Sequence, residues 1–300
     1  MAIYKSDGNK LTLPYDAVGN ALHTAYDANG DVVYTDSPYS PALTFIHSIP
    51  MSEFNPNTTI SPQGMAIYGN KIFQYFTGDD SLAIIDIDDW TIVGRYALPE
   101  FVHGNGLMFG NVIQSSGYPL LYGSQFGLSV SEESRKIAIA DVDLSSYSII
   151  GYYDIPASAG YHPQFVADWA NGTAYTIGYS NLYTTSGDMI ISAFDLSDMT
   201  TPTEQWTIPY CGVVQGTTFW NGNIIIIGDS YNYADIRLTF VDVLSHTKSE
   251  YLLTKKQSSS MEFQGVDVFD GNLMVSCWIY DNEDSRKLKY WLYSINLPID

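Results

Sequence analysis

Five segments of the chain open with a glutamine or a histidine that could bind a ligand if folding brought the five together. They are Gln63, His103, Gln164, Gln215 and Gln264, and their successive spacings are 40, 61, 51 and 49 residues. Amide and imidazole groups that converge on one point could hydrogen-bond a sugar, an ion or a column of water. Asn105, Tyr161 and His162 lie beside them in the sequence and join the candidate ligand-binding residues. The alternative interpretation is structural, because in four cases a glycine follows directly and permits close approach of another backbone.

The segments that follow these residues repeat as well. "AIIDIDDWTIVGRYALP" from Ala83 matches "AIADVDLSSYSIIGYYDIP" from Ala138, and each unit reads as four short strands. Four of the five openings lead to Gly-Asn, Asn-Gly or Asp-Gly, which is a strong hairpin signal. No apolar stripe of helical period exceeds two turns. Units of about 50 residues with four strands predict an all-β fold, a five-bladed β-propeller.

The last unit supplies only three strands, and an upstream segment completes it. "ALTFIHSIP" (42–50) resembles the closing strands "TIVGRYALP" and "SIIGYYDIP". We therefore predict that this N-terminal strand completes the fifth blade and closes the ring. The expected domains are an arm over residues 1–40 and a propeller over 41–300. The expected blades span 60–99, 100–156, 157–210, 211–255, and 256–300 plus 42–50.

Four acids recur where the third strand of a unit ends. They are Asp86, Asp141, Asp195 and Asp242. An aspartate at a strand end bonds its own backbone and favours a turn. We interpret them as structural residues.

Composition narrows the partners. The net charge is −20, from 33 acidic and 13 basic residues, so the chain lacks the basic face that nucleic acids need. No apolar run is long enough to span a membrane, so membrane insertion is not expected. The start of the sequence has no Sec signal pattern, which predicts a cytoplasmic protein, a protein released by lysis, or one carried on a virion. Cys211 and Cys277 lack metal-binding spacing, and we favour two buried thiols while a disulfide stays open.

The first residues form a smaller repeat. "YKSDGNKL", "YDAVGNAL" and "YDANGDVV" recur every 11 residues and read as turns between very short strands. The "DANGD" segment at Asp27 resembles half of a calcium loop but lacks the distal glutamate, so we expect no cofactor, with calcium as the alternative. The tandem "YDAVGN…YDANGD" pattern resembles N-terminal arms of tail-associated proteins from phages and prophages of gut bacteria. That resemblance implies an attachment arm, a tail or virion location and a larger assembly as partner.

Enzymatic and binding functions both remain possible. Glycoside hydrolysis needs two carboxyl groups at the axial pocket. Of the acids near the inner strands, Asp168, Asp267 and Asp270 lie on those strands or their turns, and only Glu262 stands at the expected mouth. Glu262 is thus the catalytic candidate of the alternative in which the protein cleaves a glycan. His103 and His162 lack carboxylate partners for a metal site, so we expect no metal.

Tyrosine-rich segments favour binding. Asn111–Lys136 and Ile177–Asp188 are rich in Tyr, Ser, Gly and Asn, which is typical of recognition loops. Their candidate residues for stacking on sugars are Tyr118, Tyr122, Phe126, Tyr179 and Tyr183; the alternative is longer hairpins with ordinary strand tyrosines. We expect a non-catalytic module that binds a cell-surface glycan. The alternatives are a glycan-cleaving enzyme and a structural or protein-docking propeller.

Overall fold

A computed structural model describes residues 24–26, 32–35, 41–56, 60–102, 104–125, 135–181, 187–229, 235–255, 261–280 and 288–297. Contacts between Cα atoms divide the chain into two units, one of residues 1–41 with 297–300 and one of residues 42–296. In the first unit, β1 (Thr24–Tyr26) pairs antiparallel with β2 (Val32–Thr35). Phe126, Tyr183, His103 and the "DANGD" segment at Asp27 lie outside the described residues.

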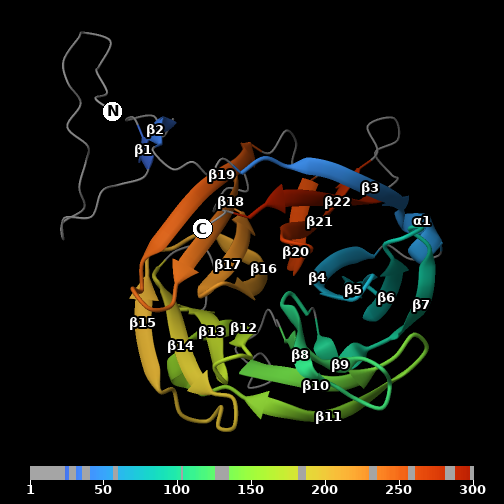
Figure 1. Cartoon of the computed structure of the whole chain (residues 1–300), viewed down its shortest axis with the longest axis horizontal. Coiled ribbons are helices and arrows are strands. Elements are labelled where there is room, and N and C mark those ends of the chain that lie inside the picture. The colour runs from blue at the N-terminus through green and yellow to red at the C-terminus, as the bar shows by residue number, and fades with distance from the viewer. Residues whose placement is uncertain are drawn as a thin grey trace. The chain divides into compact units, whose positions relative to one another are not determined.

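The second unit consists of five antiparallel four-stranded sheets arranged around one axis (Figure 1). Blade 1 contains β4 (Ser61–Tyr68), β5 (Lys71–Thr77), β6 (Ser81–Asp86) and β7 (Ile92–Ala97). Blade 2 contains β8 (Leu107–Ile113), β9 (Pro119–Ser124), β10 (Lys136–Val142) and β11 (Tyr147–Asp154). Blade 3 contains β12 (Tyr161–Asp168), β13 (Thr173–Tyr179), β14 (Met189–Asp195) and β15 (Glu204–Ile208). Blade 4 contains β16 (Val213–Trp220), β17 (Asn223–Asp229), β18 (Asp235–Asp242) and β19 (Lys248–Lys255).

Blade 5 draws on both ends of the propeller sequence. It contains β20 (Met261–Phe269), β21 (Asn272–Tyr280) and β22 (Leu288–Asn296), and β3 (Thr44–Pro50) pairs antiparallel with β22 as its outer strand. Ile49 lies opposite Tyr290 and His47 opposite Leu292. The prediction of a five-bladed propeller closed by an N-terminal strand is therefore confirmed.

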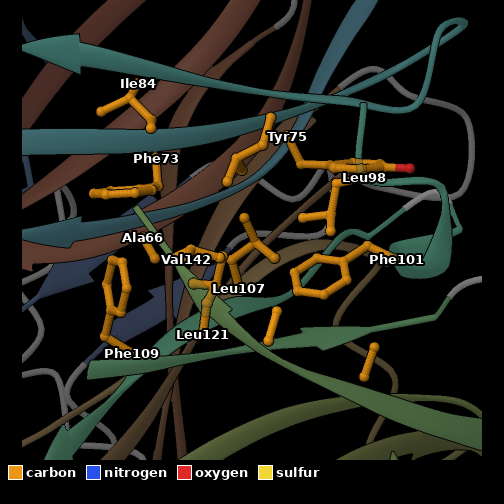
Figure 2. Packing of buried hydrophobic residues seen from close by; sticks show 13 residues of the cluster. Ala66, Phe73, Tyr75, Ile84, Leu98, Phe101, Leu107, Phe109, Leu121 and Val142 are labelled. Atoms are coloured by element: carbon orange, nitrogen blue, oxygen red, sulfur yellow. The ribbon is translucent and has the colours of Figure 1, made fainter. Parts of the chain in front are cut away.

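Hydrophobic side chains fill the spaces between blades. Each sheet packs on a neighbour at both faces, so its inner strands read as nearly continuous apolar runs. Along β5, Phe73 and Tyr75 face blade 2, whereas Ile72 and Phe76 belong to the cluster shared with blade 5. In Figure 2, the side chains of Phe73 and Ile84 from blade 1 lie across from Phe109 and Leu121 of blade 2. The hydrophobic core thus lies in the interfaces between blades.

The two ends of the propeller differ in their connections. The inner strands β4, β8, β12, β16 and β20 start at one end, which we call the loop face, and finish at the other, the turn face. At the turn face, two residues join β4 to β5, β16 to β17, and β20 to β21. At the loop face, residues 125–135 join β9 to β10 and residues 180–188 join β13 to β14. The longest connection within a sheet therefore leaves from the loop face.

Aspartates cap the turns at the turn face. The Oδ1 atom of Asp86 accepts the Asp88 N–H at 3.0 Å, that of Asp195 accepts the Ser197 N–H at 2.8 Å, and that of Asp242 accepts the Ser245 N–H at 2.7 Å. In blade 2 the equivalent acceptor is Asp143, which accepts hydrogen bonds from the backbone N–H groups of Ser145 and Ser146. The expectation for Asp141 was wrong by two residues, because β10 continues to Val142 before its turn begins.

A short helix and two single turns complete the described propeller. The helix α1 (Met51–Phe54) follows β3, and 3-10 turns η1 (Pro99–Phe101) and η3 (Ala157–Ala159) join successive blades. Within the described ranges, no helix has the length and apolar character needed to cross a membrane.

Candidate functional site

The four repeated glutamines lie where the inner strands of blades 1, 3, 4 and 5 bulge near the loop face. The pairing register shifts between Pro62 and Met65, between Tyr161 and Gln164, between Val214 and Gly216, and between Phe263 and Val266. Gln63, Gln164, Gln215 and Gln264 each lie inside or at the edge of one of these shifts. A bulge leaves residues out of the ladder and redirects their side chains. The sequence repeat therefore corresponds to a repeated backbone irregularity.

The glycines that follow these glutamines allow neighbouring inner strands to approach closely. A side-chain carbon on Gly64 would lie 2.5 Å from the Gly104 carbonyl oxygen in blade 2. One on Gly216 would lie 2.3 Å from the Gln264 carbonyl oxygen in blade 5, and one on Gly265 would lie 2.4 Å from Met65 Cβ in blade 1. Such distances leave no room for a side chain. The glycine half of the motif is structural, as the alternative interpretation predicted.

The glutamine side chains behave differently from the glycines. Gln63, Gln164, Gln215 and Gln264 are 4%, 0%, 6% and 2% exposed. Asn105, which precedes β8 in blade 2, is 3% exposed. We call these five residues the axial amide ring. Their burial means that these side chains are shielded from the bulk solvent.

Four members of the axial amide ring carry a buried oxygen that accepts no hydrogen bond. These atoms are Gln63 Oε1, Asn105 Oδ1, Gln164 Oε1 and Gln264 Oε1, and none has a partner among the residues the structure describes. A buried acceptor left without a partner costs about 1–3 kcal/mol. These four oxygens are therefore buried acceptors whose hydrogen-bonding capacity is not used by the residues the structure describes.

The fifth amide, that of Gln215, forms a hydrogen bond at the mouth of the loop face. Gln215 Nε2 lies 3.3 Å from Glu262 Oε1, and the Trp278 indole N–H donates to Glu262 Oε2 at 3.0 Å. Glu262 and Trp278 are both partly exposed. The described residues give Glu262 no ion pair with a basic side chain. The carboxylate is therefore held in place by neutral donors while part of it remains accessible.

A second carboxylate lies further along β20. Asp267 accepts hydrogen bonds from the Ile67 N–H at 2.7 Å, the Val268 N–H at 2.8 Å and the Thr218 hydroxyl at 3.0 Å. Strands of three blades enclose it, although part of its surface stays accessible. Burial raises the pKa of Asp267 to about 6, and the three hydrogen bonds oppose this rise. Asp267 links β20 to β4 and β16, so its hydrogen bonds serve the structure.

Asp267 and Glu262 do not form a close pair. They are five residues apart on one strand, so their separation is on the order of 15 Å at the usual rise per residue. Glycosidases place their two carboxyl groups about 5–10 Å apart. The remaining acids, Asp168 and Asp270, lie at the turn face, where Asp168 accepts the Asn171 side chain at 2.7 Å.

The tyrosines expected to stack on sugars are less exposed than the sequence suggested. Tyr179 is fully buried, and its hydroxyl oxygen accepts the Val214 N–H of blade 4 at 2.6 Å. Tyr122 is 8% exposed and stacks on Tyr153 and Phe165. Burial raises the pKa of Tyr122 to about 12, with a smaller contribution from Tyr153. Rings without a free face cannot stack on a ligand, so the expectation of exposure was wrong for these two.

Two expected loops are partly regular strands. Asn111–Lys136 contains the whole of β9, and Ile177–Asp188 begins inside β13. The hairpin alternative is correct for these parts. Tyr118 is partly buried against Phe73 and Tyr68.

His162 and Tyr161 lie together at the start of β12. His162 is 3% exposed with a φ of 51°, and burial, helped by the charge of Arg135, lowers its pKa. Tyr161 is partly exposed, and the Arg135 guanidinium lies 5.6 Å from its ring centre. A lowered pKa keeps the imidazole neutral at pH 7. His162 is therefore a buried neutral group and Tyr161 an accessible one.

Cysteine and metal chemistry are limited among the described residues. Cys211 and Cys277 are buried and form no disulfide, as the favoured interpretation predicted. Burial raises the pKa of the Cys211 thiol to about 12. No group of three His, Cys, Asp or Glu side chains in the described ranges could hold a metal ion. The Sγ atom of Cys211 lies 3.1 Å from the sulfur of Met189, so it packs as a core residue.

Comparison with known proteins finds only distant structural likenesses. No family model matches this chain, and no curated protein is a significant match. Solved structures similar to it include the hydrazine synthase of Kuenenia stuttgartiensis, with 15% identity, a TM-score of 0.43, and coverage of 74% of this chain and 57% of that one. A nidogen/laminin complex has 13% identity, a TM-score of 0.40, and coverage of 79% and 85%.

A third similar structure is the β-propeller domain of Cps50 (Swd1) from Myceliophteria thermophila. It has 8% identity, a TM-score of 0.38, and coverage of 77% of this chain and 83% of that one. The chain spans only 57% of the length of the hydrazine synthase chain. Because these likenesses are distant, the five sheets themselves define the fold, and the protein is a five-bladed β-propeller.

Proposed function

We propose that this propeller is a non-catalytic binding module that takes a glycan at the mouth of its loop face. The observation that carries the proposal is the partly exposed carboxylate of Glu262, held between Gln215 and Trp278 without a basic partner among the described residues. Each carboxylate oxygen receives one of these bonds and retains further acceptor capacity. Glycan hydroxyl groups are donors that would fill it.

The surrounding residues suit an uncharged ligand. Only 15% of the residues are charged, whereas 24 are tyrosines. Trp278 and Tyr161 are partly exposed aromatic residues at the same end of the sheets as Glu262. An aromatic face together with an oriented acceptor is a combination that binds a polar ring with an apolar side.

The spacing of the acids favours binding over cleavage. A hydrolytic pair requires a second carboxyl group near Glu262, whereas Asp267 lies about 15 Å away along β20. Asp267 is also occupied by Ile67, Val268 and Thr218. We therefore assign Glu262 to ligand contact rather than to acid catalysis.

We also propose that residues 1–40 attach the propeller to a larger assembly such as a phage or prophage tail. The support is the 11-residue repeat and its resemblance to tail-associated arms. The glycan would then lie on the surface of a bacterial cell. Fusing residues 1–40 to an unrelated fluorescent protein tests this part separately, and co-purification with tail particles is the expected result.

A glycan array tests the binding site directly. The full chain should retain at least one bacterial glycan, and Glu262→Gln should weaken that binding about tenfold or more, because a charged acceptor makes the stronger hydrogen bond. Asp270→Asn is the matched control. It removes one negative charge from the same blade at the turn face, where Asp270 is exposed, and should leave binding unchanged.

The same array separates the alternatives. If no glycan binds to the wild-type chain, the proposal is wrong, and protein docking becomes the better assignment for the loop face. If a glycan binds and is cleaved, with Glu262→Gln retaining binding but losing turnover, then the module is an enzyme. Equal weakening by both variants would show a general charge effect and would also contradict the proposed site.

A further inference from the structure

In every blade, the inner strand or the residues just before it carry a buried side-chain oxygen that has no hydrogen-bond partner among the described residues. Blades 1, 2, 3 and 5 contribute amide oxygens, and blade 4, whose Gln215 bonds to Glu262, contributes Thr217 Oγ1. All five side chains are at least nine-tenths buried. We call these atoms the axial oxygens; they are Gln63 Oε1, Asn105 Oδ1, Gln164 Oε1, Thr217 Oγ1 and Gln264 Oε1.

One glycine lies beside axial oxygens of two blades, and backbone contacts join the neighbouring inner strands. A carbon on Gly106, beside Asn105 of blade 2, would lie 2.7 Å from Gln164 Oε1 of blade 3 and 3.3 Å from Thr217 Oγ1 of blade 4. Beside Gln63, Gly64 donates its N–H to the Gly104 carbonyl at 2.8 Å, which joins blade 1 to blade 2. The Gly216 contact with the Gln264 carbonyl joins blade 4 to blade 5.

The axis is narrow at this level. Besides its neighbours β12 and β20, β16 also contacts β4 and β8 across the ring. Figure 1 shows these five inner strands gathered around the centre of the propeller. A guest that reaches several axial oxygens must therefore be small, which excludes a sugar ring at this depth.

Five buried acceptors without a partner among the described residues carry a large free-energy cost. Burying a single acceptor without a partner already costs at least as much as one hydrogen bond contributes. Five such groups together are comparable with the net stability of a whole domain. The ring therefore needs a guest that interacts favourably with oxygen atoms.

The charges near the axis favour a cation as that guest. Glu262 lies at the loop-face end of β20 and Asp267 further along the strand, and the described residues pair neither with a basic side chain. The chain as a whole carries a net charge of −20. Neutral amide and hydroxyl oxygens are ligands that hard cations accept, and a glutamine can turn its oxygen toward the axis.

We propose that the axial oxygens form a binding site for one hard cation, of the calcium or alkali-metal class, that ties the five blades together. Water molecules would complete the coordination shell. Since the protein ligands are neutral, we expect modest affinity, with dissociation constants on the order of millimolar. The site lies deeper than the mouth at Glu262 and does not depend on the glycan proposal.

Thermal unfolding of the full chain tests the site. Protein freed of metal with a chelator is titrated with calcium, sodium or potassium chloride, each against tetramethylammonium chloride at equal ionic strength. A cation that binds only the folded chain raises the unfolding midpoint. We expect at least one of them to raise it by about 3 °C or more at saturation, with one ion per chain by elemental analysis.

Two pairs of variants locate the ion. Gln164→Leu should weaken the cation about tenfold or more, and Gln164→Glu should strengthen it, because the added charge faces the ion. Thr217→Val should reduce the shift. The same change at Thr176, a buried residue of β13 whose hydroxyl also has no partner in the described part of the chain, should leave the shift intact. If Gln164→Leu fails to fold, the cation affinity of Gln164→Glu still tests the site.

Three results would overturn the proposal. The first is a wild-type chain that shows no cation-specific shift and no bound ion, which would mean that water alone fills the axis. The second is a shift that survives both Gln164→Leu and Thr217→Val. The third is a shift that disappears in Asp27→Ala, which would assign the ion to the "DANGD" segment of the arm.

Discussion

The carboxylates that cap the turns are ionised groups whose hydrogen bonds exist only in the folded chain. In Asp143 and Asp242, bonds from backbone N–H groups are the largest cause that lowers the pKa below its usual 3.8. In Asp195 the hydroxyl of Ser197 is the largest cause, followed by its N–H. A carboxylate with a lowered pKa in the folded state stabilises the fold above its unfolded pKa, and this contribution is lost as the pH falls through the folded value.

We predict that the aspartates in these turns account for part of the stability that the propeller loses at low pH. The triple variant Asp143→Asn, Asp195→Asn, Asp242→Asn keeps an oxygen acceptor in each turn but removes the titrating group. Its free energy of unfolding should therefore fall less steeply than that of the wild type as the pH drops below 3.8. Urea unfolding between pH 3 and 7 measures this slope. Asp270→Asn serves as control, and identical slopes for the triple variant and the wild type would contradict the prediction.

Individual side chains show where sequence reasoning succeeds and where it stops. The turn aspartates follow from local chemistry, because the acceptor and its donors are two or three residues apart. The sequence suggests Tyr122 and Tyr179 as surface residues, yet they are buried between blades. The sequence alone does not reveal this, since tyrosine serves equally in a strand core and on a binding surface. Only the pairing of blades decides between them.

At the scale of the strands, the inner strand of each blade combines a bulge with a close approach. The Gln-Gly repeat predicted equivalent positions, and the structure places a bulge at four of them. The bulges themselves could not be predicted, because an added residue changes which face each side chain occupies without changing the sequence period. The amides are therefore buried at the bulges, where the sequence indicated only a shared mouth.

We predict that the close approach of β16 to β20 tolerates no side chain. Gly216→Ala places a carbon 2.3 Å from the Gln264 carbonyl oxygen and 3.1 Å from the Val266 nitrogen, and backbone atoms cannot easily move away. Overpacking of this kind should cost about 1–3 kcal/mol of unfolding free energy. Urea denaturation with a fluorescence readout would measure it.

Gly151→Ala is the matched control for that change. Gly151 lies on the outer strand β11, where an added carbon meets no atom within 4 Å. Its effect should stay within about 0.5 kcal/mol. Equal destabilisation by the two variants would show that β16 and β20 approach less closely than described.

At the scale of the whole molecule, each boundary between blades is closed by side chains and by hydrogen bonds. Gly64 bonds to Gly104 between blades 1 and 2, and Ser124 accepts the Phe165 N–H between blades 2 and 3. A hydrogen bond to Tyr179 joins blade 3 to blade 4, and one from Gln215 joins blade 4 to blade 5. A hydrogen bond to Asp267 joins blade 5 to blade 1. The sequence predicted the number of blades and the closing strand because both follow from counting strands. It could not indicate these bonds, which join residues far apart in the chain.

We predict that β3 is essential for ring closure, whereas residues 1–41 are not. A chain starting at Ala42 should unfold within about 2 °C of the full chain, because the lost residues belong to the other unit. A chain starting at Met51 leaves β22 with an unpaired edge and should self-associate or lose cooperative unfolding. Adding a peptide of residues 42–50 should restore a single transition by pairing with β22. Full stability without β3 and without the peptide would contradict the prediction.

The pairing of β3 with β22 also has a consequence for synthesis on the ribosome. β3 is the first strand of the propeller to be translated, but its partner is completed about 240 residues later, which at ordinary elongation rates takes on the order of tens of seconds. During that time, blades 1 to 4 can form one after another while the earliest strand waits unpaired. Contacts so distant in sequence form slowly. The last step of folding is therefore the meeting of the oldest and the newest parts of the propeller, and a nascent chain is most vulnerable to aggregation just before it.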